Sequence, residues 1–292
     1  MNLRTLLTLG RTSNLPTVWS NMLSGAVLSG APFDGGSLAL LLLVGSAFYE
    51  GGMFLNDAFD AELDRRERPA RPIPSGQVTQ KTVFALGFGS LGFGLLLLGA
   101  APLVRLSRPG PGAWLAGLGT CAAVLVYNRW HKGFGWSPIV MGACRAGLYA
   151  TAALAVSGTL GGVLLIGAGS LWLYIVGLTH IARFETGRVV DRAWVAAFVL
   201  SPLLVAVPTV IARRGVLPAL CFVLLLGWSL RSMSFALRGG KGQIPRAVVS
   251  LIAGVSLVDA LFISLHGAPW LVLAPLGAFL LTLKWQRKIP GT

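Results

Sequence analysis

The sequence predicts an all-α membrane protein, built as one polytopic bundle of transmembrane helices over residues 1–292. Hydrophobic residues make up 54% of the chain and charged residues only 12%, whereas soluble domains carry about 25% charged residues. The mean hydropathy is +0.73. Apolar runs near the ~20 residues that a helix needs to cross a bilayer follow one another along the chain. The loops between them are short, so we expect a single transmembrane domain and no separate soluble domain.

Ten apolar runs define the expected helices, in order. They fall at about 15–32, 37–56, 79–101, 111–128, 136–156, 161–182, 194–211, 216–236, 247–265 and 269–285. The first run lies where a signal peptide would lie, but the many runs after it favour a first membrane helix. The last two runs are the least cleanly separated, so nine and ten crossings both fit the sequence.

The basic residues indicate how the apolar runs are oriented across the membrane, because they gather in every second loop. The N-terminal segment, alternate loops and the C-terminal segment carry 18 of the 24 Lys and Arg residues. The loops on the opposite side carry four, namely Arg105, Arg108, Arg213 and Arg214. Cytoplasmic loops are enriched in Lys and Arg, so we expect cytoplasmic termini in the inner (plasma) membrane. This topology also explains the net charge of +14 without a nucleic-acid partner, since the basic residues form no single patch.

Five of the ten carboxylates fall within eleven residues at the end of the second run. Three of them, Asp57, Asp60 and Asp64, lie within roughly 60° of one another if the segment is helical. Carboxylates on one helix face repel each other unless a cation lies between them, and Mg²⁺ binds through a few carboxylates plus substrate phosphates. Arg68 and Arg71 follow at once and could hold a phosphate. The cluster therefore predicts a Mg²⁺–phosphate site on the cytoplasmic side.

This segment resembles a known family signature. Asn56-Asp57-x-x-Asp60-x-x-x-Asp64, followed by Arg68 and Arg71-Pro72-Ile-Pro74-Ser-Gly76, is similar to the first motif of the UbiA-type intramembrane prenyltransferase superfamily. Arg11…Pro16-Thr-x-Trp19 and Tyr127-Asn128…Lys132 are weaker likenesses to other parts of that family. The resemblance implies nine to ten helices around a lateral cavity open to lipid. It also implies Mg²⁺-dependent transfer of a prenyl group from a polyprenyl diphosphate to a small aromatic or hydroxylated acceptor, with release of diphosphate.

The resemblance also implies roles for individual residues. Asn56, Asp57, Asp60 and Asp64 would hold Mg²⁺, while Arg68, Arg71 and Lys132 would cradle the diphosphate, with Arg11 and Tyr127 beside the substrate. The family's second Asp-rich motif departs from the pattern here. Only Glu185 lies near its expected place, as a catalytic residue and metal ligand, and Arg183 could replace part of the missing charge. Met141-Gly-Ala-Cys144-Arg145 resembles the EboC-like branch.

The altered second motif keeps other functions open. One alternative is a non-catalytic binder or transporter of a prenyl or phosphorylated lipid. A second is an ion-coupled transporter in which the Asp cluster is a cation gate. Gly87-Phe-Gly89-Ser-Leu-Gly92 matches a dinucleotide-binding pattern, but it lacks the strand–helix context, so we interpret it as helix packing.

Several polar residues lie inside the apolar runs, where each can have a functional or a structural role. An arginine within a membrane span normally faces a cavity or a partner, so Arg145 either binds substrate in the cavity or forms a structural ion pair. Asp259 is expected to pair with Arg231 of the preceding run. Glu50 lines the cavity or bonds to a neighbouring helix. We assign no role to His131.

Overall fold

The computed structural model describes residues 1–100, 111–132, 134–183, 193–238, 242–289 and 291. The described chain is helical and contains no strand. Its helices are α1 (Leu3–Leu9), α2 (Leu15–Leu28), α3 (Gly35–Glu67), α4 (Gln80–Gly99), α5 (Pro111–Trp130), α6 (Ser137–Val156), α7 (Gly162–Ala182), α8 (Ala193–Arg213), α9 (Val216–Arg238), α10 (Gln243–His266) and α11 (Leu273–Gln286). Two 3₁₀ turns, η1 (Thr12–Asn14) and η3 (Pro269–Val272), precede α2 and α11. Each of the ten predicted runs overlaps one of the helices α2 to α11.

The number of helices that cross the membrane is only partly established. Seven helices in the described ranges, α3, α4 and α6 to α10, are long and apolar enough to cross. By contrast, α2 and α11 have 14 residues each, which is about 21 Å of helix against a hydrocarbon core of about 30 Å. Nine or ten crossings, and a cavity open sideways to lipid, therefore remain predictions.

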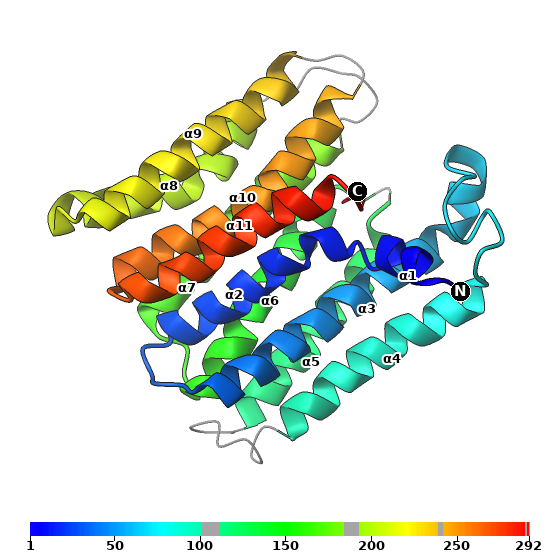
Figure 1. The fold of residues 1–292 in the computed structure, drawn as a ribbon, viewed down its shortest axis with the longest axis horizontal. Helices are drawn as coiled ribbons and strands as arrows, with labels where there is room; N and C mark the ends of the chain where they lie inside the picture. The colour runs from blue at the N-terminus through cyan, green and yellow to red at the C-terminus, as the bar shows by residue number, and fades with distance from the viewer. Residues whose placement is uncertain (101–110, 133, 184–192, 239–241, 290, 292) are drawn as a thin grey trace.

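The helices form one bundle (Figure 1), in which α10 packs against α2, α7, α9 and α11. The α8–α9 pair lies at one edge of the bundle, and α4 lies at the opposite edge. Two large apolar clusters fill the interior, one centred on α7 and α10 and the other on α2, α3 and α6. The end of α11 lies beside the start of α2, because the Asn14 side chain donates to the Gly291 carbonyl and accepts from Gln286 of α11.

The acidic segment belongs to α3, which is longer than the apolar run that predicts it. Asp34 caps its first turn by accepting from the Ser37 backbone N–H at 2.7 Å. The helix then continues for 33 residues to Glu67, about 50 Å. A helix of that length exceeds the bilayer core, so α3 carries the carboxylates on its final turns. The chain leaves α3 through a turn ending at Gly76, whose φ of +76° suits glycine.

The glycine pattern in α4 partly supports helix packing. A Cβ on Gly87 would lie 2.6 Å from the Leu55 side chain of α3, so glycine permits this close approach of the two helices. Gly89 and Gly92 have nothing within 4 Å of that position. The close-packing interpretation therefore holds for Gly87 and not for the other two glycines.

Candidate active site

One face of α3 carries the predicted carboxylates. Asp57, Asp60 and Asp64 are all buried, with 4% to 9% of each residue exposed. Glu62 and Glu67, which lie on other faces of the same segment, are exposed. The prediction from helical spacing is therefore confirmed. Since isolated buried charges are costly, these three carboxylates must be compensated by neighbouring cations.

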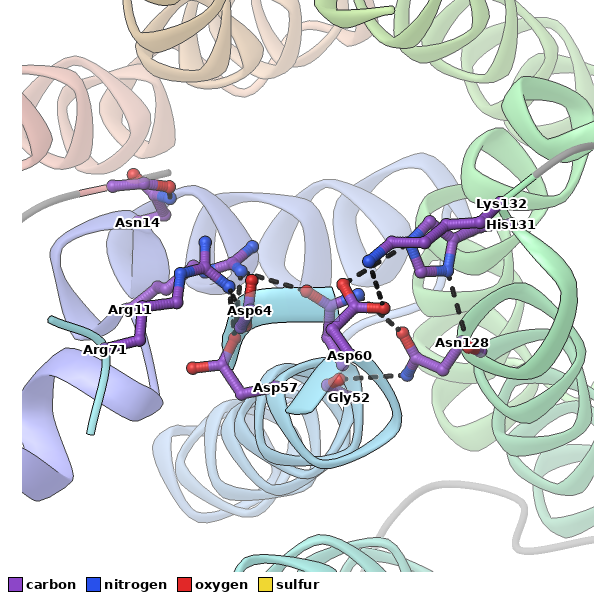
Figure 2. A network of polar contacts seen from close by, with 12 residues as sticks. Arg11, Asn14, Gly52, Asp57, Asp60, Asp64, Arg71, Asn128, His131 and Lys132 are labelled. Atoms are coloured by element: carbon purple, nitrogen blue, oxygen red, sulfur yellow. Dashed lines mark hydrogen bonds and ion pairs between the residues drawn. The ribbon is translucent and has the colours of Figure 1, made fainter. Parts of the chain in front are cut away.

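Two arginines compensate the carboxylates on one side of the cluster (Figure 2). Arg71 Nη1 lies 3.2 Å from Asp57 Oδ1 and 2.9 Å from Asp64 Oδ2, so one guanidinium bridges two turns of α3. Arg11 Nη2 lies 3.1 Å from Asp57 Oδ1 and 2.9 Å from Asn56 Oδ1. The loop that carries Arg71 thus folds back onto α3, the helix that precedes it. Arg71 is only seven residues from Asp64, so a short turn is enough to bring the two side chains together.

Arg11 reaches the cluster through an unusual backbone conformation. Its φ of +42° lies in the left-handed region, which costs a non-glycine residue about 1–3 kcal/mol and is concentrated at functional sites. The Tyr49 hydroxyl donates to the Arg11 carbonyl at 3.2 Å and holds the turn in place. Burial lowers the pKa of the Arg11 guanidinium, but the nearby Asp57 and Asp60 carboxylates outweigh it and raise the pKa, so the group stays charged.

The end of α5 compensates the third carboxylate. Lys132 Nζ lies 2.7 Å from Asp60 Oδ1, and His131 Nε2 lies 3.5 Å from Asp60 Oδ2. Asn128 donates to the Gly52 carbonyl at 2.9 Å and accepts from the Asn56 amide at 3.2 Å, which fixes α5 against α3. His131 also stacks on Tyr127 with ring centroids 5.0 Å apart. Sequence analysis assigned His131 no role, and the structure places it in contact with Asp60 and Tyr127.

A cavity of about 390 Å³ opens beside the cluster. Ten of the twelve predicted site residues line it: Arg11, Asn56, Asp60, Asp64, Arg68, Arg71, Tyr127, Lys132, Arg145 and Arg183. Asp57 faces Arg11 and Arg71 and does not line the cavity. Glu185 lies outside the described residues, so its predicted role is untested. The volume is within the usual range for a small-molecule site.

The cavity changes character with depth. Its polar mouth is formed by the ends of α3, α5 and α7. Its apolar walls come from five helices, α3, α5, α6, α7 and α10, through Phe48, Val124, Leu148, Ile175, Leu178, Ile252 and Val255. Arg183 at the α7 end donates to the Gly135 carbonyl at 3.2 Å. The α10 residues were missed because apolar side chains within an apolar run give no local signal of the face they occupy. Glu50 is among the described residues and does not line the cavity.

The predicted Asp259–Arg231 pair is wrong. Arg231 is exposed on α9, where its guanidinium lies 4.9 Å from the Trp228 ring and 5.5 Å from the Phe235 ring. Asp259 is fully buried on α10 and accepts hydrogen bonds from α2 and α6 instead. The two residues therefore occupy different surroundings, although their helices are neighbours in sequence and in space.

Each of the three carboxylates contacts a basic side chain, and the three do not converge on one point where a metal ion could bind. Among the described residues, no three His, Cys, Asp or Glu side chains gather closely enough to hold a metal ion by themselves. The donor types nevertheless suit Mg²⁺, which prefers carboxylate and amide oxygens and completes its shell with phosphate and water. A phosphate ligand would therefore have to enter together with the metal.

Residues 14–245 match the model of the UbiA prenyltransferase family. The chain belongs to this family. It is similar to digeranylgeranylglyceryl phosphate synthase of Metallosphaera sedula, with 28% identity over 162 residues that cover 56% of this chain and 45% of the relative. It is 38% identical over 95 residues to the same enzyme of Methanopyrus kandleri, covering 32% of this chain and 35% of the relative. These matches span less than half of either relative.

Solved structures of UbiA homologues share the fold of this family member. A homologue from Aeropyrum pernix K1 superposes with a TM-score of 0.65 at 17% identity, covering 87% of this chain and 97% of that one. A homologue from Archaeoglobus fulgidus bound to DMAPP and Mg²⁺ superposes with a TM-score of 0.52 at 13% identity, covering 91% and 98%. The family and the seven apolar helices identify this chain as an integral membrane protein.

Proposed function

We propose that this UbiA family member transfers a prenyl group from a polyprenyl diphosphate to a small aromatic or hydroxylated acceptor within the membrane, with Mg²⁺ as cofactor, and releases diphosphate. The observation that carries the proposal is the alternation of carboxylates and cations at the mouth of an apolar cavity. A diphosphate and a cation fit this alternation, and a prenyl chain fits the apolar walls. The Archaeoglobus fulgidus homologue binds DMAPP together with Mg²⁺, which supports the same ligands here.

The existing ion pairs indicate how the ligands would be held. Asp57, Asp60 and Asp64, with the Asn56 carbonyl oxygen, would hold Mg²⁺, which supplies Lewis-acid polarisation of the phosphate oxygens when bound. Arg11, Arg71 and Lys132 now bind these carboxylates. They would exchange carboxylate oxygens for phosphate oxygens, so no buried charge is left without a partner.

The proposed reaction separates charge along the cavity. The allylic C–O bond breaks and its electron pair leaves with the diphosphate, while the acceptor donates an electron pair to the allylic carbon. The acceptor atom that forms the new bond then loses its proton to the released diphosphate. The guanidinium and ammonium groups at the mouth stabilise the developing negative charge because they are already oriented there. The apolar walls exclude water, which would otherwise capture the carbocation. Tyr49 and Tyr127 also line the cavity, and aromatic rings beside a carbocation would stabilise it by cation–π contact.

We also propose ten crossings, with the site on the cytoplasmic side of the inner (plasma) membrane. The ratio of 18 to 4 basic residues on the two sides supports this orientation. The contact of Gln286 and Gly291 with Asn14 supports an even number, because it brings the end of α11 to the start of α2. Labelling of single cysteines introduced at Arg65 and Arg213 from either side of sealed vesicles tests this topology. Reaction of both from the same side contradicts it.

Binding of geranylgeranyl diphosphate to the purified protein, with and without Mg²⁺, tests the proposed function without knowledge of the acceptor. Wild type is compared with Asp60→Asn and Glu185→Gln, and Glu62→Gln serves as a control on an exposed face of α3. We expect Mg²⁺-dependent binding that is lost in Asp60→Asn and kept in Glu62→Gln. Loss in Glu185→Gln as well would indicate a two-sided metal site. No Mg²⁺-dependent binding by wild type overturns the proposal, and binding without turnover of any acceptor favours a non-catalytic carrier.

A further inference from the structure

A cluster of arginines and aromatic rings lies outside the cavity, where the end of α9 meets the start of α10. The guanidinium of Arg231 on α9 lies 4.9 Å from the Trp228 ring and 5.5 Å from the Phe235 ring. The guanidinium of Arg246 on α10 lies 6.0 Å from the same Phe235 ring. Both arginines are exposed. One ring thus has a guanidinium from each of two helices beside it, and these four residues are called the arginine–aromatic cluster below.

No negative charge of the chain balances this cluster. Residues 216–258 contain four basic residues and no Asp or Glu. In the part of the chain that the structure describes, neither Arg231 nor Arg246 forms an ion pair or donates a hydrogen bond from its side chain. Two like charges beside one ring repel each other, and the repulsion is stronger next to hydrocarbon than in water. An anion that contacts both guanidinium groups would replace this repulsion by attraction.

The surroundings of the cluster indicate that this anion comes from the membrane. Arg231 lies seven residues before the end of α9 at Arg238, about 10 Å along the helix axis. Leu230 and Leu237 on the same part of α9 are 52% and 59% exposed. Figure 1 places the α8–α9 pair at one edge of the bundle. An exposed apolar surface of a membrane helix contacts acyl chains, so the nearest anions on this side of α9 are the phosphates of lipid headgroups.

The aromatic part of the cluster is held in place by other helices. Trp228 Nε1 donates to the Ser250 carbonyl of α10 at 2.7 Å. Phe279 of α11 meets the Trp228 ring edge-on, with ring centroids 4.8 Å apart. A ring fixed in this way restricts where the Arg231 guanidinium can lie, because cation–π contact attracts it to the ring. The N–H fork of an arginine placed beforehand matches two oxygens of a phosphate with little further loss of freedom.

We propose that the arginine–aromatic cluster binds the headgroup of an anionic phospholipid. The lipid phosphate contacts Arg231 and Arg246, and the acyl chains lie along the exposed leucines of α9. Basic pockets between membrane helices and interfacial tryptophans are suited to such headgroups. The bound lipid adds a contact between α9 and α10 and so stabilises the α8–α9 edge of the bundle. This inference depends on the membrane location of the chain and not on the proposed prenyl transfer.

The test compares two lipids that share their acyl chains and differ in the charge of the headgroup. The purified full chain, delipidated in detergent, is titrated with dioleoyl phosphatidylglycerol or dioleoyl phosphatidylcholine, and lipid binding is measured by native mass spectrometry. Glycerol 3-phosphate is added as a soluble competitor. Wild type is compared with Arg231→Gln, Arg246→Gln and the double variant.

Arg129→Gln is the matched control. Arg129 is also an exposed arginine near the end of its helix, with its guanidinium 5.9 Å from the Trp130 ring. Among the described residues, no second arginine approaches that ring. Loss of Arg129 therefore removes the same charge and the same kind of ring contact without affecting a paired site.

We expect phosphatidylglycerol to bind wild type at least about tenfold more tightly than phosphatidylcholine. Each single substitution should weaken phosphatidylglycerol binding by roughly fivefold, the effect of one basic residue beside an anionic lipid surface. The double variant should bind the two lipids alike, and Arg129→Gln should match wild type. Phosphatidylglycerol should also raise the Tm of wild type more than that of the double variant, whereas the lipid-free Tm values should agree if the fold is intact.

Four results overturn the inference. The first is equal binding of the two lipids by wild type, and the second is an unchanged preference for phosphatidylglycerol in the double variant. The third is an equal loss in Arg129→Gln and Arg231→Gln, which indicates a general attraction between a basic protein and anionic lipid. The fourth is displacement of the lipid by glycerol 3-phosphate, which assigns the cluster to a soluble phosphate. Mg²⁺-dependent diphosphate binding tests the proposed function separately, so either proposal can fail alone.

Discussion

Arg71 offers the most direct test of the charge arrangement at the cavity mouth. Its side chain is 18% exposed and contacts Asp57 and Asp64, whose side chains are 8% and 5% exposed. Arg71→Gln removes one charged hydrogen bond from each carboxylate, and such bonds contribute about 1.5–3 kcal/mol each without being additive. We therefore expect a loss of about 3 kcal/mol in the free energy of unfolding. For a chain of this size that loss lowers the Tm by roughly 6–12 °C.

Mg²⁺ should reverse part of this loss, because the freed carboxylates gain a different cation. Thermal unfolding in detergent at a fixed scan rate, with a chelator or with Mg²⁺, measures the effect. Mg²⁺ should raise the Tm of Arg71→Gln more than that of wild type, in which Arg71 competes for the same oxygens. Arg65→Gln is the control, because Arg65 and its partner Glu62 are 52% and 68% exposed and such pairs contribute about 0–1 kcal/mol. Equal Tm values for the two variants in chelator, or no additional Mg²⁺ effect, would refute the reasoning.

Three further predictions concern the fold around the site. Gly87→Ala should lower the free energy of unfolding by about 1–3 kcal/mol through overpacking against α3. Gly89 lies on the same helix with open space around it, so Gly89→Ala should be neutral or slightly stabilising. Denaturant unfolding of both variants measures the difference. Asp259→Ala should cost about 2–4 kcal/mol, because it leaves three buried donors without their acceptor. A loss no larger than about 0.6 kcal/mol, the average for single hydrogen bonds within membranes, would contradict it. The hydrogen bond from the Ser37 backbone N–H lowers the pKa of Asp34 in the folded protein. The stabilisation from this cap is therefore complete above the pKa of an unfolded aspartate, about 3.9. It is lost as the pH falls through the lower pKa of the folded state. The Tm difference between wild type and Asp34→Ala should be constant near neutrality and shrink below about pH 4.

The helices and the acidic face were predictable because the signals are local. Apolar length alone defines a candidate membrane helix, and each predicted run overlaps one helix of the structure. The spacing of Asp57, Asp60 and Asp64 places them on one face of any helix, whatever surrounds it. The family resemblance added Arg11 and Lys132, which lie far from the acidic segment in sequence and contact it in the structure.

The partners of the remaining polar residues were not predictable, because they depend on which helix faces pack together. His131 follows α5 by one residue, and nothing in its neighbourhood indicates that the end of α5 meets Asp60 on α3. Asp259 has its partners on α2 and α6, more than one hundred residues earlier. The predicted pair with Arg231 relied on the fact that the two apolar runs are adjacent in sequence. Adjacent runs indicate that α9 and α10 are in contact, but they do not indicate which faces of the two helices meet.

The two arginines within apolar runs show what additional signal the sequence did hold. Trp228 and Phe235 lie three residues before and four residues after Arg231, so its own helix supplies the aromatic faces that accommodate an exposed guanidinium. Such a side chain can extend along the helix surface towards water without a tertiary partner. Arg145 takes its ring contact and its hydrogen bond from other helices, Tyr49 of α3 and Asn21 of α2. An intramembrane arginine whose own helix provides no such contact needs partners on other helices to stabilise its charge. Arg145 finds these partners where α2, α3 and α6 meet, at the cavity.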